Sequence, residues 1–277
     1  MIDSYFFIPG DKPNYLSKIY KLNADYIVID LEDAVSINKK QSAFELVLAL
    51  TFNKNMFLRI PFFDNCYTTE QLKSLILKFD GQIVLPKINS IEDVNKVISL
   101  SEGNPLKMIV LIENPKSFIA TEEILKAFSN QIHAIGFGSH DFCTITGIKH
   151  TLEHLAHYKR QLILYAKAFN VAFLDGVDLN LKNFDEFKKE CVFAFESGAD
   201  GKFMIHPFQL EELHKVDFMS EEEINQLQFV YEKVKNIPDD NIEVYTIEGK
   251  VYEKPHIIRI KYLMEKMERK YNNNLKS

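Results

Sequence analysis

The sequence predicts a (β/α)8 barrel followed by a helical C-terminal extension. Eight short apolar runs have the length of buried strands, and they begin about every 25–35 residues, the length of a strand–helix unit. Buried strands that alternate with helices imply a parallel sheet, and eight repeats imply that the sheet closes. The expected strands are Tyr5–Ile8, Tyr26–Asp30, Met56–Ile60, Ile83–Leu85, Met108–Ile112, Ala134–Phe137, Ala172–Leu174 and Phe203–Ile205.

The stretches between these runs have the periodicity of amphipathic helices. Apolar residues recur at spacings of three and four, for example over residues 16–22 and 72–79. Pro115 suits the first position of a helix. An open, doubly wound sheet is the competing architecture. It would have a glycine-rich first turn, whereas residues 9–13 read Pro-Gly-Asp-Lys-Pro.

The pattern changes after the eighth run. We expect a catalytic barrel over residues 1–210 and a C-terminal extension over residues 211–277. The expected elements of the extension are a helix (Glu221–Val234), a polar linker (Asn236–Asn241), a β-like stretch (Ile242–Ile247), a turn at Gly249 and a charged helix (Pro255–Tyr271).

The composition excludes several classes of protein. With 277 residues, 46% hydrophobic and 26% charged, the chain is typical of a globular protein with a large core. A net charge of −6 and a pI near 5.8 argue against a nucleic-acid surface. The three separated cysteines argue against a disulfide framework or a zinc ribbon. No run approaches the roughly 18 apolar residues of a membrane span, and no signal peptide is evident. We expect a cytoplasmic protein.

Charged residues follow the expected strands at their C-terminal ends. In barrels of this type that rim carries the active site. One charge after a strand is usually part of a solvated loop, but this many at one rim indicate a site. In strand order they are Asp30, Glu32 and Asp33, Arg59, Lys87, Glu113, Asp141, Asp175 and His206.

Glu113 and Asp141 follow neighbouring strands, so their carboxylates should lie close together. Two carboxylates that close repel each other unless a proton or a cation lies between them. Oxygen ligands without a histidine or cysteine cluster favour Mg²⁺ over Zn²⁺. Gly136 and Gly138 would let the backbone approach a ligand closely. The sequence therefore predicts a magnesium site at this rim.

Four other rim residues complete the expected site. Asp30, Glu32 and Asp33 are expected to hold metal-bound waters. Arg59 presents a planar fork suited to a substrate carboxylate or carbonyl oxygen. A metal ion and an arginine around a carbonyl form an arrangement that stabilises an enolate.

Other chemistries fit the residues less well. A Ser-His-Asp triad drawn from residues 139–141 fails because adjacent residues cannot converge. His150, His154 and His157 have helical spacing but no carboxylate partner nearby, which favours a solvated or subunit-facing helix edge. A Schiff base on Lys87 is disfavoured because the surrounding acidic residues would keep its amine charged.

Several of these motifs occur together in a known family. They are Phe7-Ile8-Pro9-Gly10, residues 24–35 (ADYIVIDLEDAV), Leu58-Arg59-Ile60, residues 84–87 (VLPK), Ile112-Glu113, residues 137–141 (FGSHD), Asp175-Gly176 and residues 200–207 (DGKFMIHP). Their order covers nearly the whole chain, and DLEDAV together with DGK-x-x-IHP is highly specific. On these motifs the chain resembles the citrate lyase beta-subunit family of the HpcH/HpaI aldolase/citrate lyase superfamily, which includes malyl-CoA and citramalyl-CoA lyases.

The resemblance implies a homotrimeric or homohexameric TIM-barrel enzyme with Mg²⁺ on Glu113 and Asp141. It implies an acyl-CoA or keto-acid substrate and a catalytic role for Arg59. It also implies that the extension over residues 211–277 covers a neighbouring subunit's site and supplies it with a catalytic acid/base. Glu248 occupies a similar position, where the family more often has Asp. The expected substrate contacts are Arg59, Lys87, Gly138, Pro9 and Gly10.

Three hypotheses follow. The first is a Mg²⁺-dependent carbon–carbon lyase of Claisen type, acting on a small 3-hydroxyacyl-CoA such as malyl- or citramalyl-CoA, with a thioesterase variant included. The second is a metal-dependent aldolase on a free, pyruvate-type hydroxy-keto acid, which would need a catalytic histidine near the metal. The third is a subunit that depends on an acyl-carrier partner, or a diverged binding protein without activity of its own. The family commonly has Thr-Ala where this chain has Asn114-Pro115, and this departure predicts a different acyl group. Many relatives have glycine where this chain has Asn170, which should preserve a left-handed turn.

Overall fold

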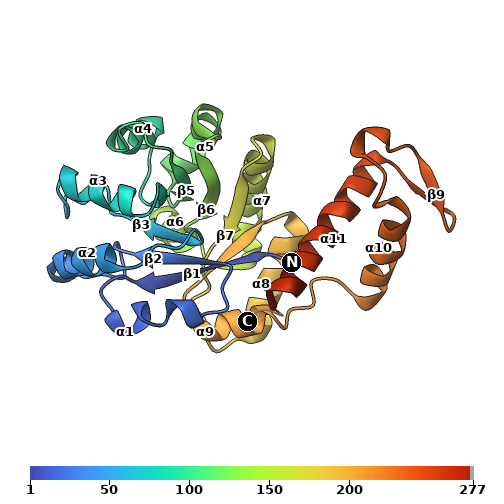
Figure 1. Ribbon diagram of the computed structural model, residues 1–277, viewed down its shortest axis with the longest axis horizontal. Helices are drawn as coiled ribbons and strands as arrows, with labels where there is room; N and C mark the ends of the chain where they lie inside the picture. The colour runs from blue at the N-terminus through green and yellow to red at the C-terminus, as the bar shows by residue number, and fades with distance from the viewer. Residues whose placement is uncertain (275–277) are drawn as a thin grey trace. The chain divides into compact units, whose positions relative to one another are not determined.

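The computed structural model describes residues 1–274, so residues 275–277 of the expected extension lie outside the described residues. Eight parallel strands form a closed barrel in the order β1 to β8, which confirms the predicted fold class (Figure 1). Each strand lies within two residues of its predicted bounds. The strands are β1 (Asp3–Pro9), β2 (Tyr26–Asp30), β3 (Met56–Arg59), β4 (Gln82–Leu85), β5 (Lys107–Ile112), β6 (Ile132–Phe137), β7 (Ala172–Asp175) and β8 (Gly201–Met204).

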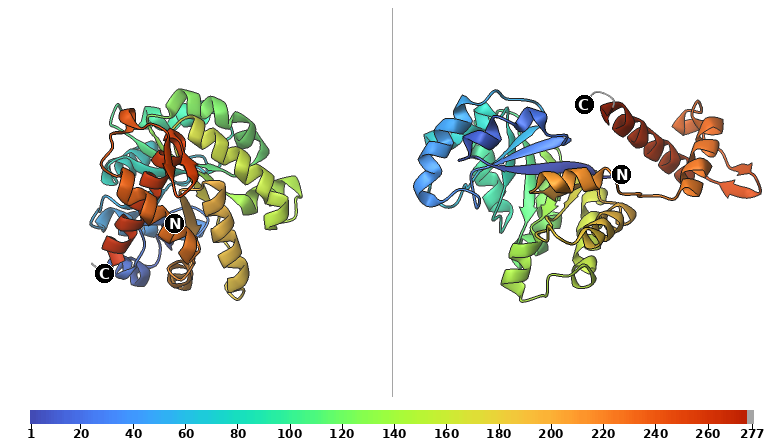
Figure 2. Two further views of the ribbon diagram at one scale, coloured as in Figure 1. Left: turned by 90° about the vertical axis from the view of Figure 1, so that its right-hand side faces the viewer. Right: turned by 90° about the horizontal axis from the view of Figure 1, so that it is seen from below.

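Helices follow every strand and cover the outside of the barrel (Figure 2). Pro115 begins its helix as predicted, and Asn170 has a φ of 56°, which confirms the left-handed turn. The helices are α1 (Pro13–Leu16), α2 (Lys40–Ala49), α3 (Thr69–Lys78), α4 (Ile91–Leu100), α5 (Pro115–Phe128), α6 (Ser139–Thr146), α7 (Leu152–Ala168), α8 (Phe184–Ser197) and α9 (Pro207–Leu213).

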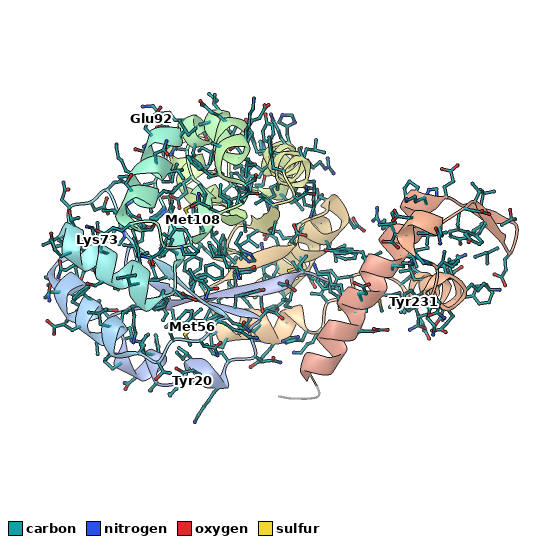
Figure 3. All side chains as sticks on the ribbon, turned by 45° about the horizontal axis from the view of Figure 1, so that its top comes forward. Tyr20, Met56, Lys73, Glu92, Met108 and Tyr231 are labelled. Carbon is teal, nitrogen blue, oxygen red and sulfur yellow. The ribbon has the colours of Figure 1, made fainter. Side chains whose placement is uncertain are left out.

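The interior of the barrel is filled by side chains from all eight strands. Because side chains alternate along a strand, every second residue points inward and the rest pack under the helices. Met56 and Met108, labelled in Figure 3, are buried, whereas Glu92 projects from α4 into solvent. The inward cluster contains Tyr5, Val28, Phe57, Val84, Ile109, Leu111, Ala134, Leu174 and Phe203.

A histidine is held among aromatic rings in this packing. The Tyr5 hydroxyl lies 2.8 Å from His133 Nε2, and the His133 ring stacks on Phe57. Burial, with Lys107 adding to it, lowers the pKa of His133 to about 4. Burial also raises the pKa of Tyr5, so its hydroxyl keeps its proton and can donate it to Nε2. The imidazole is therefore neutral in the folded protein.

We expect the barrel to lose stability as the pH falls from about 6.5 to 4. An unfolded histidine titrates near pH ~6.5, whereas folded His133 titrates near 4, so protonation favours the unfolded chain. The stability present above pH ~6.5 is lost across this window, by up to about 3 kcal/mol. Urea unfolding at pH 7 and 4.5 should show a smaller loss in His133→Gln than in the parent. The exposed control His157→Gln should keep the parental loss, and an equal loss in all three proteins would contradict the prediction.

The chain forms a second compact unit that begins at Asp217, so α9 belongs to the barrel unit, which ends at Val216. Glu221–Val234 is helical as predicted, and the β-like stretch is one strand of a hairpin. This unit contains α10 (Glu221–Val234), β9 (Tyr245–Ile247), β10 (Lys250–Tyr252) and α11 (Lys254–Asn274). Its buried side chains include Val230, Val234, Ile242, Ile247, Ile257, Ile260 and Met264. Among the described helices, none is both long and apolar enough to cross a bilayer.

Candidate active site

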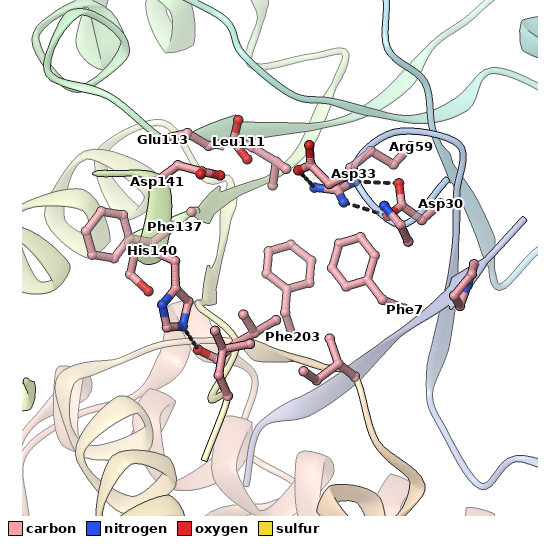
Figure 4. A pocket seen from close by; sticks show the side chains of 17 residues that line it. Phe7, Asp30, Asp33, Arg59, Leu111, Glu113, Phe137, His140, Asp141 and Phe203 are labelled. Carbon is pink, nitrogen blue, oxygen red and sulfur yellow. Dashed lines mark hydrogen bonds and ion pairs between the residues drawn. The ribbon is translucent and has the colours of Figure 1, made fainter. Parts of the chain in front are cut away.

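A cavity of about 490 Å³ lies at the C-terminal ends of the strands (Figure 4). It has a charged side and an apolar floor, and it brings together the two predicted metal ligands and the predicted catalytic arginine. The charged side comprises Asp30, Asp33, Arg59, Glu113 and Asp141. The floor comprises Phe7, Leu111, Phe137 and Phe203.

Glu113 follows β5 and is only 5% exposed. Lys87 has a φ of 55°, and in this left-handed conformation its backbone N–H donates to Glu113 Oε2 over 2.8 Å. A Cβ on Gly138 would lie 2.3 Å from Glu113 Cγ, so only glycine leaves room for this carboxylate. Burial, with Glu32 and Asp141 nearby, raises the pKa of Glu113 to about 7. A proton or a cation would relieve the cost of this buried charge.

Asp141 lies in the first turn of α6, is exposed, and lines the cavity beside Glu113 (Figure 4). Within the part of the chain that the structure describes, no group of three His, Cys, Asp or Glu side chains could hold a metal. Mg²⁺ in proteins is commonly bound by one or two carboxylates and keeps its other positions for water or substrate. The Glu113–Asp141 pair suits that ion, and its assignment as the metal site is a proposal.

Arg59 ends β3 and is held by three carboxylates. Its Nε and Nη2 donate to the two oxygens of Asp30 over 2.8 and 2.6 Å. Its Nη1 lies 3.1 Å from Glu32 and 3.4 Å from Asp33. Although burial lowers the pKa of Arg59, these carboxylates raise it above its ordinary value. The fork expected to hold a substrate is therefore already occupied by Asp30, and at most the remaining N–H of Nη2 is free for a ligand.

Replacing Arg59 by Lys should lower kcat/KM about a hundredfold, or roughly 2–3 kcal/mol of transition-state binding. A single ammonium cannot bridge Asp30 while also contacting Glu32 and a ligand. Steady-state kinetics with saturating Mg²⁺ would measure the loss. Arg160→Lys, which changes a side chain outside the cavity that lies over the Phe193 ring, is the matched control and should be silent. An Arg59→Lys enzyme within threefold of the parent would reduce Arg59 to a packing role.

Lys87 contacts two of the carboxylates that also hold Arg59, those of Glu32 and Asp33. Its Nζ lies 2.9 Å from Glu32, 3.4 Å from Asp64 and 3.7 Å from Asp33. Burial lowers the pKa of Lys87, but these carboxylates outweigh burial and raise it, so the amine stays charged. A protonated amine is no nucleophile, which agrees with the rejection of a Schiff base. Burial raises the pKa of Glu32 to about 7 although Arg59 and Lys87 lie beside it.

Two glycines near the site make room for side chains. A Cβ on Gly136 would lie 2.5 Å from the Phe203 ring, and Gly138 accommodates the expected metal ligand. Gly136 therefore makes room for the Phe203 ring, while the close approach of a ligand to Gly138 stays a prediction. Pro9 and Gly138 line the cavity, whereas Gly10 packs against the end of β2.

A histidine pair beside the cavity was not predicted. His140 lines the cavity, and its ring stacks on that of His150 with 3.8 Å between centroids. His150 Nε2 lies 2.9 Å from Ser139 Oγ. His150 precedes α7, so the predicted helical spacing with His154 and His157 was wrong for this residue. Sequence spacing carries no signal for a contact that depends on the loop before a helix.

Two residues expected to line the rim serve the fold. Asp175 is fully buried and ion-pairs with Lys159 over 2.9 Å and with Lys202 over 3.0 Å. Lys202 is also fully buried and lies 3.1 Å from Glu190, and none of these four side chains lines the cavity. His206 is exposed and caps α9 with its ring. His140 is thus the only histidine among the residues that line the cavity.

Asn114 also has a structural role. Its side-chain oxygen caps α5 by accepting the Ser117 backbone N–H over 3.0 Å, and its amide donates to the Ile88 carbonyl. Asn114 does not line the cavity. The expectation that this departure alters the acyl group therefore gains no support from its position.

Glu248 lies in the second unit, at the turn between β9 and β10. It is exposed and has a φ of 50°, followed by Gly249 at 76°. Two successive left-handed residues form a type I′ hairpin turn, in which Asn or Asp is preferred at the first position. A glutamate held in this conformation is strained, which motivates a functional hypothesis for it.

The family model described as HpcH/HpaI aldolase/citrate lyase matches residues 3–207 of the chain. Citrate lyase subunit beta of Leuconostoc mesenteroides subsp. cremoris is 27% identical over 94% of this chain and 91% of its own length. A (3S)-malyl-CoA thioesterase of Cereibacter sphaeroides is 28% identical over 96% of this chain and 94% of its own length.

Solved structures share the fold. The protein CitE from Mycobacterium tuberculosis, in complex with magnesium, acetoacetate and coenzyme A, superposes with a TM-score of 0.74. It is 21% identical, and the match covers 94% of this chain and 98% of that one. RipC from Yersinia pestis has a TM-score of 0.67 at 24% identity, over 81% and 98% of the two chains. These similarities establish the barrel fold.

Proposed function

Because the chain belongs to the HpcH/HpaI aldolase/citrate lyase family and is a carbon–carbon lyase, we propose that it cleaves a small 3-hydroxyacyl-CoA thioester in a Mg²⁺-dependent reaction. The observation that carries the proposal is the convergence of Glu113, Asp141 and Arg59 on one cavity at the catalytic end of the barrel. Malyl-CoA and coenzyme A are named for two of the similar proteins. For this chain, a malyl- or citramalyl-CoA-like substrate is part of the proposal.

Three residues that line the cavity, and Lys87 beside it, have distinct tasks in this reaction. Glu113 and Asp141 would hold Mg²⁺, which supplies a Lewis acid for an oxygen on which negative charge develops. Arg59 lines the same cavity and is held in place by Asp30, which leaves at most one N–H of Nη2 for the substrate. Lys87 turns its backbone N–H to Glu113 and fixes that carboxylate. The apolar floor excludes water from the reacting carbons.

The bond that breaks joins the α-carbon of the thioester to the carbon that bears the hydroxyl. A base removes the hydroxyl proton, and that C–O bond becomes the carbonyl of the released keto acid or aldehyde. The electron pair of the broken bond passes to the α-carbon, which then takes up a proton to give the acyl-CoA. We assign the second of these proton transfers, to the α-carbon, to Glu248 of a second copy of the chain, in a homotrimer or homohexamer.

Two other functions use the same residues. A metal-dependent aldolase on a free hydroxy-keto acid would need a histidine base, and the ring of His140 lines the cavity with its Nε2 3.2 Å from the Val177 carbonyl. A lyase subunit that depends on an acyl-carrier partner would use the same cavity with a different thiol. The purified protein with Mg²⁺ should therefore be assayed against malyl-CoA, citramalyl-CoA and a free 4-hydroxy-2-oxo acid. Turnover of the thioesters alone supports the proposal, and turnover of the free acid alone supports the aldolase.

Glu248→Gln should lower kcat by about 10²–10⁴-fold while the affinity for the thioester changes little, because the amide cannot transfer a proton. Glu248→Asn should lose the same activity while making the hairpin more stable, because Asn-Gly is favoured in a type I′ turn. Thermal unfolding and steady-state kinetics on both variants would separate the two effects. Glu243→Gln, an exposed residue of the same unit, is the control and should be silent.

Mixing Arg59→Lys subunits with Glu248→Gln subunits tests whether the site is shared. If Glu248 acts on a neighbour, some mixed oligomers regain a complete site and part of the activity returns. Absence of recovery, under conditions where subunits demonstrably exchange, would place Glu248 in its own subunit's site or outside catalysis.

A further inference from the structure

The floor of the cavity is apolar and fixed in place. Leu111, Phe137 and Phe203 are each at most 3% exposed, and Phe7 packs on Phe203 with 5.1 Å between ring centroids. The space that Phe203 fills exists because Gly136 has no side chain. A polar ligand group directed at this floor would lose its water without gaining a partner. The floor therefore selects for an apolar group on the bound substrate.

The wall of the cavity also favours an apolar group. Val177, Leu179 and Ile205 line the cavity on the side of β7 and β8. Leu179 and Ile205 are 57% and 38% exposed, so they form an apolar mouth that a ligand can cover. Large apolar side chains left partly exposed at a cavity mouth are typical of a binding surface.

Arg59 is the only Lys or Arg among the residues that line the cavity. Two of its nitrogens are taken by Asp30 and the third by Glu32 and Asp33. Together with the expected Mg²⁺, it can meet one carboxylate of a ligand. A second carboxylate would find no unpaired cation in the cavity.

The charges on the cavity wall oppose a second ligand carboxylate. The lining carries four acidic side chains, Asp30, Asp33, Glu113 and Asp141, against the single arginine, a formal charge of −3 when all are ionised. A bound Mg²⁺ leaves −1, and the carboxylate of a 2-oxo acid returns the sum to −2. Each further negative charge would be desolvated beside like charges without a partner.

We propose, resting on the proposed lyase function, that the keto-acid half of the substrate carries an apolar substituent where citrate-type substrates carry a second carboxylate. The released product is then a 2-oxo acid of the pyruvate type, with one carboxylate and a small alkyl group that lies on the floor formed by Phe7, Leu111, Phe137 and Phe203. Oxaloacetate, with two carboxylates, is disfavoured.

Calorimetric titration of the whole protein with 2-oxo acids at saturating Mg²⁺, without any thioester, tests this preference. The decisive pair is 4-methyl-2-oxopentanoate and oxaloacetate, which match in size and differ in the charge of the terminal group, with pyruvate as the smaller ligand. We expect pyruvate or the branched acid to bind at least tenfold more tightly than oxaloacetate. Oxaloacetate binding equally or more tightly would overturn the inference. If Mg²⁺ binds but no 2-oxo acid does, the proposed function fails, and the inference with it.

A charge introduced at the mouth supplies the matched test. Ile205→Arg places a cation on the wall at a partly exposed position where folding is not at risk, and it should raise oxaloacetate affinity at least fivefold relative to pyruvate. Leu164→Arg, at an exposed position on α7 outside the cavity, should leave the ratio unchanged. An unchanged ratio in Ile205→Arg would show that wall charge does not set the preference.

Discussion

Glu113→Gln and Asp141→Asn should each abolish Mg²⁺ binding and lower kcat/KM by about a thousandfold or more. A Lewis acid supplies several kcal/mol of charge stabilisation, and each ~1.4 kcal/mol is worth tenfold in rate. The loss should come without unfolding, because the pKa of Glu113 near 7 shows that folding already disfavours its charge. We therefore expect Glu113→Gln to be at least as stable as the parent.

Calorimetry with Mg²⁺ and thermal unfolding with and without Mg²⁺ measure these effects. The parent should melt at a higher temperature with Mg²⁺, since a ligand that binds only the folded state stabilises it, and both variants should lose this shift. Glu122→Gln, on the exposed surface of α5, should keep it. Unchanged Mg²⁺ affinity in Glu113→Gln would refute the assignment of the metal site.

Lys202→Met should cost about 3–5 kcal/mol of unfolding free energy, a large share of the stability of a typical domain. The Lys202 ammonium is fully buried, donates to Asp175 over 3.0 Å and to the Gly176 carbonyl over 2.8 Å, and also meets Glu190. Burial lowers the pKa of Lys202, but the carboxylates outweigh burial and raise it, so the ammonium is charged. Its removal would leave buried carboxylates short of a partner.

Urea unfolding measures this loss of unfolding free energy, and an ion pair on the surface serves as the matched control. Lys167→Met removes an ammonium that is 47% exposed and ion-paired with Asp200, and it should cost no more than about 1 kcal/mol. A Lys202→Met protein as stable as the Lys167→Met protein would mean that the buried cluster contributes little. Lys202 does not line the cavity, so this test concerns the stability of the fold and not a substrate contact.

The fold could be predicted from the sequence because buried strands and amphipathic helices have different periods. Tyr26–Asp30 and Glu221–Val234 were predicted with the bounds that the structure has. The eight-fold alternation fixed the closed barrel, and with it the rim on which Arg59, Glu113 and Asp141 meet. The periodicity of the sequence locates each strand, and it therefore says which residues lie at the strand's ends.

The periodicity of the sequence does not say which side chains pair at the end of a strand. Arg59 was expected to face a substrate, yet its fork is held by Asp30. This pairing depends on side-chain rotamers and on the loop after β2, which the periodicity of the sequence does not describe. Asp175 was placed at the correct strand end, but its side chain faces the helices, where Lys159 meets it from α7. Contacts between elements distant in the chain leave no periodic signal.

The most direct test of the central claim is product analysis after incubating the protein and Mg²⁺ with malyl- or citramalyl-CoA. A carbon–carbon lyase releases acetyl-CoA together with glyoxylate or pyruvate, and the thioester bond of the substrate is retained in the acetyl-CoA. Mass spectrometry of the CoA species, with Glu113→Gln as the blank, distinguishes this result from hydrolysis. We expect acetyl-CoA and the 2-oxo acid in equal amounts. Free CoA together with intact malate or citramalate would contradict the account, because the carbon chain would then be unbroken.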